Sequence, residues 1–256
     1  MVIKLLVCII AGLGAGFGTG FAGMSAAAVI SPMLITFLGV PAYEAVGIAL
    51  ASDVLASAVS ANNYRKNKNI DIKNGVVMMI FVLIFTLIGS YIAKLVPNGT
   101  MGGMSVLMTT FLGVKFIVKP VMTTKEKRLE NSRKKQIIQS VISGALVGFI
   151  CGFIGAGGGM MMLLVLTSFL GYELKTAVGT SVFIMTFTAL TGALSHFVIG
   201  GMPDIQCLVL CIISTLIFAQ IASKLANKAS PKTLNRAVGV ILVILGISMM
   251  IIKFVK

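Results

Sequence analysis

Apolar runs separated by short polar connectors fill the sequence from end to end. In the first half, long runs extend to about residue 21 and cover 42–62, 76–95 and 101–119, and a shorter run covers 26–38. A helix needs about 20 residues to cross a hydrocarbon core of about 30 Å. The long runs therefore predict membrane-spanning helices, whereas the short run cannot span as a straight helix.

The second half repeats this series of long and short runs. Its long runs cover residues 137–154, 174–197, 205–226 and 233–254, and its short run covers 160–170. Both short runs are expected to be half-helices that enter the membrane without crossing it. The pattern predicts an all-α polytopic membrane protein.

The composition agrees with a multi-pass protein of the cell membrane. The chain is 57% hydrophobic and only 11% charged, and its mean hydropathy is +1.05. These values exclude a water-soluble domain. The four cysteines lie in apolar runs without CxxC or Cys/His spacing, so we expect buried thiols, no metal and no cofactor.

Short matches at one fixed spacing predict an internal two-fold repeat. A shift of 132 residues aligns GFGTGFAG at 16–23 with GFICGFIG at 148–155, and FLG and AVG further along recur at the same shift. The repeat predicts two halves, 1–122 and 137–256, joined by the charged linker 123–136.

The positive charge identifies the cytoplasmic side of the predicted repeat. The chain has 21 Lys and Arg against 7 Asp and Glu, and the basic residues gather in connectors 65–73, 119–135 and 224–236. With no basic soluble domain to carry it, nucleic-acid binding is not expected, and the clusters indicate the positive-inside rule. They fall between different segments in the two halves, which favours an inverted repeat with every basic connector cytoplasmic.

A glycine-rich stretch, GFIGAGGGM at 152–160, interrupts the apolar pattern of the second half. Each glycine in a helix interior costs about 1 kcal/mol relative to alanine, and irregular backbone survives at membrane depth only inside protein or beside a cavity. Backbone N–H groups that glycine leaves uncovered, next to the start of a half-helix, can bind a small anion. Close helix packing is the alternative, and it explains scattered glycines such as Gly12, Gly144 and Gly148.

A second polar motif, AVGTS at 177–181, offers two hydroxyl groups early in a predicted span. Thr180 and Ser181 can donate hydrogen bonds to an anion without placing a charge in lipid. Hydrogen bonding back to their own helix is the alternative. The counterpart in the first half, AVGIA, lacks both hydroxyls, and GMSAA at 23–27 keeps only Ser25. The two halves are therefore expected to contribute unequally to a site.

Asp53 is the ionisable residue that stands out, because it lies about halfway along a predicted span. A carboxylate at this depth is expected to be functional, as a coupling or proton-carrying group, with protons as the candidate coupling ion. The alternative is a buried acid that is held neutral or paired with a lysine. His196, the single histidine, lies near the end of a span and is expected to be interfacial rather than part of a proton relay.

With these residues placed, the chain resembles the sulfite exporter TauE/SafE family of membrane proteins over nearly its full length. The resemblance rests on GFICGFIGAGGGM at 148–160, FLGYELKTAVGTS at 169–181, GALSHFVIGGMPD at 192–204, and echoes in the first half that include SPML at 31–34 and YRKNKNIDIKNG at 64–75.

The resemblance implies a secondary transporter that exports small sulfur-containing anions, such as sulfite or organosulfonates, without ATP hydrolysis in this chain. The chain departs from the family pattern at two places: the first half has lost most of the glycine and hydroxyl motif, and Leu164 stands where the first half has Pro32. Together with Ser25 from the first half, the residues expected to bind the substrate are Gly155, Gly157, Gly158, Gly159, Gly179, Thr180 and Ser181.

Two other classes of function compete with transport. A membrane assembly or accessory protein that binds a partner through its helix grooves is the alternative, although such a scaffold has no need of bare amides at half-depth. An enzyme is not expected, because the sequence offers no histidine cluster, no paired carboxylates and no Ser/His/Asp set. The oligomeric state, the coupling ion and the direction of transport do not follow from the sequence.

Overall fold

Every regular element in the described part of the chain is a helix, as the apolar pattern predicts. A computed structural model describes residues 2–97, 132–154 and 158–228, together with scattered positions between 100 and 118 and between 230 and 251. Six of the described helices are long and apolar enough to cross a membrane. The helices are α1 (Val2–Ala22), α2 (Ala27–Leu38), α3 (Ala42–Lys66), α4 (Ile72–Lys94), α6 (Arg133–Ile154), α7 (Gly158–Leu164) with a π-helical continuation (Val165–Phe169), α8 (Leu174–Gly200) and α9 (Ile205–Ala226).

The observed bounds follow the expected ones closely. Helix α9 has the expected limits, and α2 begins one residue later than the run at 26–38. The expected helices at 101–119 and 233–254 lie largely outside the described residues, as does most of the linker at 123–136. Helix α6 begins at Arg133, inside the range assigned to that linker. The division into two halves stays a prediction.

In the first half, a short irregular stretch separates α1 from α2. Gly23 lies there with a φ of 61°, in the left-handed region that favours glycine. The first eight residues of α2 are all buried, so this half-helix is enclosed by protein rather than lipid, as irregular backbone at this depth requires. Residues 155–157 lie outside the described residues, so the matching break in the second half stays a prediction.

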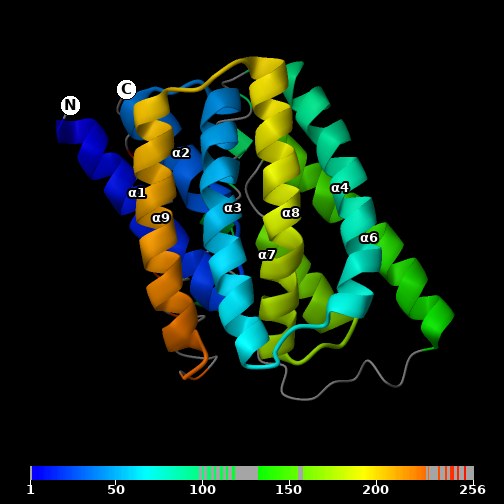
Figure 1. The fold of residues 1–256 in the computed structure, drawn as a ribbon. Coiled ribbons are helices and arrows are strands. Elements are labelled where there is room, and N and C mark those ends of the chain that lie inside the picture. Colours follow the sequence, from blue (N-terminus) through cyan, green and yellow to red (C-terminus); the bar gives the residue numbers. More distant parts are fainter. Residues whose placement is uncertain are drawn as a thin grey trace.

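The helices pack across the two proposed halves. Helices α3 and α8 pack together in the middle of the molecule and run in opposite directions (Figure 1). Helix α1 packs against α9, and α6 packs against α4. The helices that would correspond in the two halves, α1 with α6 and α4 with α9, also run in opposite directions (Figure 1). This is the arrangement expected of inverted halves, although the duplication itself is not tested by it.

Glycines spaced four residues apart allow the two outer helix pairs to approach closely. A Cβ at these positions would overlap or crowd atoms of the facing helix, so the backbones touch as in other small-residue interfaces of membrane helices. The packing interpretation is confirmed for Gly12, Gly144 and Gly148. The glycines of α1 that face α9 are Gly12, Gly16 and Gly20, and those of α6 that face α4 are Gly144, Gly148 and Gly152.

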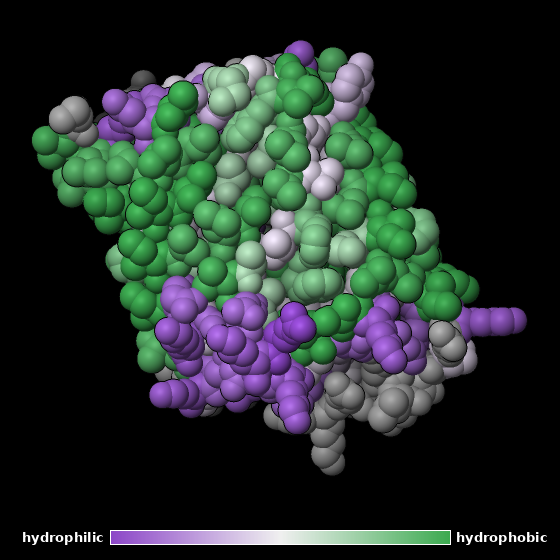
Figure 2. Space-filling model, viewed as in Figure 1, coloured by the Kyte–Doolittle hydropathy of each residue, from purple (hydrophilic) through white to green (hydrophobic). Residues whose placement is uncertain are grey.

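The described basic residues of the three connectors gather at one end of the helix bundle, which we call the basic end. Hydrophilic residues cluster at this end, at the bottom of the view in Figure 2. The opposite end holds the single ion pair among the described residues, between Lys4 and Asp204. The Lys4 ammonium, together with the Cys207 N–H, holds the pKa of the Asp204 carboxyl below its usual range. The exposed basic residues of the basic end include Arg65, Lys66, Lys68, Lys73, Lys134, Lys135, Lys224 and Lys228.

Labelling of engineered cysteines from outside the cell tests the orientation of the bundle. Because the basic end is expected to be cytoplasmic, Lys66→Cys and Lys228→Cys should both be shielded from an impermeant thiol reagent added to intact cells. Met202→Cys is the matched control, since Met202 is 76% exposed in the α8–α9 connector at the opposite end and should be labelled. The four native cysteines are buried. Labelling of only one of the two basic-end cysteines would contradict the inverted arrangement.

Candidate functional site

Asp53 lies fully buried in the middle of α3, about 16 Å along the helix from its first residue. Its carboxylate accepts hydrogen bonds from the Ser25 hydroxyl at 2.9 Å and from the Thr19 hydroxyl at 3.4 Å. The N–H of Ala26 also donates to it. Since Ala26 precedes the first residue of α2, the carboxylate occupies the positive end of this half-helix. The partners of Asp53 among the described residues are hydroxyls and an amide rather than a lysine.

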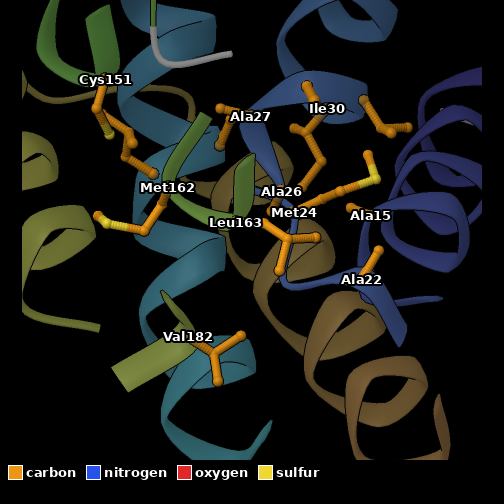
Figure 3. Packing of buried hydrophobic residues seen from close by; sticks show 14 of the residues in the cluster. Ala15, Ala22, Met24, Ala26, Ala27, Ile30, Cys151, Met162, Leu163 and Val182 are labelled. Carbon is orange, nitrogen blue, oxygen red and sulfur yellow. The ribbon is translucent and has the colours of Figure 1, made fainter. Parts of the chain in front are cut away.

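The two short helices meet beside Asp53. A Cβ at Gly159, in the first turn of α7, would overlap the carbonyl oxygen of Gly23 and would lie 2.6 Å from the Ser25 nitrogen. Only a residue without a side chain fits at this contact. Met24 next to Gly23 and Leu163 of α7 belong to the same buried cluster (Figure 3). The irregular stretch of the first half therefore touches the start of the second short helix.

Ser181 joins the same contact from α8. A Cβ at Gly23 would overlap the Ser181 hydroxyl oxygen, so this hydroxyl lies directly against the irregular stretch. Ser181 also donates to the Val178 carbonyl at 2.8 Å. That bond is of the kind expected for a serine that bonds back to its own helix. The structure thus brings Ser25, Gly159 and Ser181 together.

A methionine occupies the position in the second half that corresponds to Asp53. The shift of 132 residues carries Asp53 onto Met185, and the Met185 sulfur would contact a Cβ at Gly159. Asp53 faces the start of α2, and Met185 faces the start of α7. One short helix therefore begins beside a carboxylate of the protein itself, and the other begins beside a neutral thioether.

Gly179 and Thr180 lie elsewhere, against the connector between α3 and α4. The Thr180 hydroxyl oxygen accepts a hydrogen bond from the Asp71 N–H at 3.0 Å, and a Cβ at Gly179 would overlap the Asn69 carbonyl. Asp71 in turn caps α4 by accepting from the Asn74 N–H at 3.1 Å. Gly158 is the first residue of α7, and Gly155 and Gly157 lie outside the described residues.

Thr180→Val is expected to lower the free energy of unfolding by about 1 kcal/mol, because it leaves the Asp71 N–H without its acceptor. Thr180→Ser keeps the oxygen and should stay close to wild type. Thermal unfolding in detergent measures both variants. Wild-type stability of Thr180→Val combined with weaker substrate binding would mean that the hydroxyl serves the substrate instead.

His196 is buried, which corrects the expectation that it is interfacial. Its side chain is 2% exposed, and its ring lies against the Tyr43 ring with centroids 4.2 Å apart. A position near the end of a span places a residue along the membrane normal, but the packing of α8 against α3 decides whether it faces lipid, water or protein. The sequence carries no signal for this burial.

The sequence also missed Thr19 and Met185. Thr19 donates to Asp53 across 34 positions of the chain, and nothing in a local pattern links two such residues. Met185 could have been found, since the same 132-residue shift that suggests the repeat also aligns it with Asp53.

Comparisons with known proteins identify the family of the chain. The model of the family Sulfite exporter TauE/SafE matches residues 8–249. The chain is similar to the "Probable membrane transporter protein YunE" of Bacillus subtilis, at 23% identity over 95% of this chain and 96% of that protein. It is similar to the "Probable membrane transporter protein MJ0441" of Methanocaldococcus jannaschii, at 25% identity over 93% and 91% of the two chains.

A "Probable membrane transporter protein" of Haemophilus influenzae is 27% identical over 96% of this chain and 97% of its own length. No solved structure shows significant similarity to the chain. The family match covers nearly the whole sequence, both short helices included. The chain is therefore a multi-pass membrane protein that belongs to the sulfite exporter TauE/SafE family.

Proposed function

We propose that this protein is a secondary transporter that exports small sulfur-containing anions, of the sulfite or organosulfonate class, across the cell membrane. Family membership and the relatives named as membrane transporters support a membrane transporter. The substrate class and the direction follow from the family description and are part of the proposal. Protons are the proposed coupling ion, with Asp53 as the group that carries them.

The meeting of the two short helices is the observation that carries this proposal. Their starts lie in contact deep inside the bundle, at Gly23, Ser25 and Gly159. A helix start attracts negative charge, and the start of α2 already faces the Asp53 carboxylate. The start of the second short helix faces Met185, so its partner would be an anion from solution.

We therefore propose that the substrate binds where the second short helix begins, between Ser25 and Ser181. The glycines of residues 155–159 would let an anion approach the backbone amides, and the two hydroxyls would donate to its oxygens. Asp53 would bind its proton within reach of the same contact. A negative charge at Asp53 and a bound anion repel each other, which gives a physical reason for their binding to be linked.

Transport in proteoliposomes tests the proposal directly. Purified protein should move sulfite, or a small sulfonate, faster than protein-free vesicles do, and an imposed proton gradient should drive accumulation. Sulfate, thiosulfate and chloride define the selectivity. Failure to move any sulfur-containing anion, in protein that is folded and fully inserted, would contradict the proposed substrate class.

A further inference from the structure

Both ring nitrogens of His196 face carbonyl oxygens of the backbone. Nε2 lies 3.0 Å from the Gly152 carbonyl oxygen on α6, and Nδ1 lies 3.2 Å from the Tyr43 carbonyl oxygen on α3. A carbonyl oxygen only accepts hydrogen bonds, and a neutral imidazole has one N–H. Both contacts are hydrogen bonds at once only when the ring carries a second proton.

The two carbonyl groups differ in their need for this hydrogen bond. Gly152 lies in the last turn of α6, where carbonyl groups have no N–H from their own helix and where the helix dipole favours a cation. The Ser90 hydroxyl also donates to it, at 3.4 Å. Tyr43 lies in the first turn of α3, where helical geometry supplies its carbonyl with the N–H four residues later. A ring that loses one proton should therefore keep its N–H toward Gly152 and give up the bond to Tyr43.

A cavity lies between this histidine and the end of the bundle that is opposite to the basic end. It has a volume of about 180 Å³ and is lined by Tyr43, Glu44, His196, Phe197 and the connector at residues 200–203. The Glu44 carboxylate in its wall accepts from the Asp204 N–H at 2.7 Å. Since the side chain of Asp204 is 36% exposed and Met202 in the cavity lining is 76% exposed, the cavity lies between the ring and the aqueous end of the bundle.

The other titratable groups of the neighbouring elements do not form an ion pair with the ring in the described residues. Helix α4 contributes Lys94, which donates to the Ile199 carbonyl on α8 at 2.9 Å. The titratable groups of these elements include Tyr43, Glu44 and Asp53 on α3, Cys151 on α6, Tyr91 and Lys94 on α4, and Asp204 before α9, whereas Arg65, Lys66, Lys73, Lys134 and Lys135 lie at the basic end.

We propose that His196 is a second proton-binding site, separate from Asp53 and reached from the opposite end. The protonated ring ties α8 to both α6 and α3, and loss of the proton releases the bond to α3. Gly152 lies in the last turn of α6, the helix that precedes the glycine-rich stretch 155–159 in the sequence, so the proton acts on the helix that leads to the proposed substrate site. The role in transport rests on the proposed function, whereas the protonation itself does not.

Nitrogen NMR of the histidine ring tests the protonation without any substrate. His196 is the single histidine of the chain, so protein labelled with ¹⁵N-histidine, in nanodiscs, gives the signals of this ring alone. Between about pH 5 and about pH 8 we expect a change from a doubly protonated ring to a neutral ring with its proton on Nε2. A ring that stays neutral over this range, or a neutral ring with its proton on Nδ1, would overturn the proposal.

Exchange transport tests the role of this proton. His196→Gln offers one donor and one acceptor and cannot gain a proton, so it should lose the share of the pH dependence that His196 supplies. The ratio of exchange rates of a small sulfonate, whose charge is constant over this range, at about pH 6 and about pH 8 should lie at least about twofold closer to one than in wild type. Thr188→Val is the matched control, because Thr188 is buried on the same helix and, within the described part of the chain, its hydroxyl donates to the Ile184 carbonyl of its own helix. It should keep the wild-type ratio.

The two measurements separate the two proposals. Equal exchange ratios in wild type and His196→Gln would remove His196 from transport. If the wild-type protein moves none of the anions, the proposed function fails, and the ring signals still decide whether His196 binds a proton from the opposite end.

Discussion

Asp53→Asn is expected to abolish proton-driven uptake, with a loss of at least about tenfold, which corresponds to about 1.4 kcal/mol. Asparagine has nearly the shape of aspartate and keeps an oxygen that can accept from the Ser25 hydroxyl, now at 2.9 Å from Asp53. It cannot bind and release a proton. Exchange of substrate at equal concentrations on both sides should therefore stay within about threefold of wild type, because it needs no coupling ion. Uptake into proteoliposomes with and without a proton gradient measures both rates.

Ser52→Ala is the matched control for Asp53→Asn. Ser52 is the neighbouring residue on α3, is fully buried, and donates to the Ile48 carbonyl of its own helix at 2.9 Å. Its loss should change neither rate by more than about twofold. Gradient-driven uptake by Asp53→Asn at the wild-type rate would show that Asp53 is a structural cap for the start of α2 and carries no coupling proton.

Met185→Asp is expected to reduce substrate affinity by at least about a hundredfold, or about 2.7 kcal/mol. It would give the second half the carboxylate that the first half has at Asp53. The Met185 sulfur contacts the position of a Cβ at Gly159, so an ionised carboxylate there would take the place proposed for the anion and would repel it. Binding of sulfite to the purified protein, by calorimetry or by protection against thermal unfolding, measures the loss.

Met185→Asn separates charge from shape at this position. The asparagine side chain has the size and polarity of aspartate without its charge, so the affinity for sulfite should stay within about tenfold of wild type. The thermal stability of both variants shows whether they fold, because Met185 is 2% exposed and both side chains are smaller than methionine. Equal affinity for Asp and Asn variants would place the anion away from the start of the second short helix.

The helices themselves were largely predictable from the sequence. The apolar run at 26–38 predicted a helix too short to span, and α2 covers Ala27–Leu38. The run at 205–226 matches α9. Such elements follow from local hydrophobicity, because lipid leaves a backbone almost no alternative to helix. The close packing of Gly12, Gly144 and Gly148 was also predictable from local sequence, because only small residues allow the backbones of neighbouring helices to touch.

The partners of the candidate site were much less predictable. The sequence singled out Ser25, Ser181 and Asp53 by residue type and depth. It could not show that Thr180 accepts from the Asp71 N–H across 109 positions of the chain, or that Ser25 donates to Asp53 across 28. A hydroxyl at a helix start suits an anion, a neighbouring helix or its own backbone equally well, and local pattern does not distinguish the three.

By itself, then, the sequence determined a helical membrane protein, the approximate limits of its spans, the side on which its basic residues gather, and the resemblance to its family. The first three depend on the transfer of local segments between water and lipid, which residue type alone sets, and the resemblance depends on motifs that stand in the sequence itself. The tertiary structure alone decided that α1 pairs with α9 and α6 with α4, that Gly159 meets Gly23, and that His196 is enclosed between two carbonyl groups. These contacts join residues far apart in the chain, and they depend on which faces of apolar helices pack together, a choice that hydrophobicity does not make because every face of such a helix is compatible with lipid.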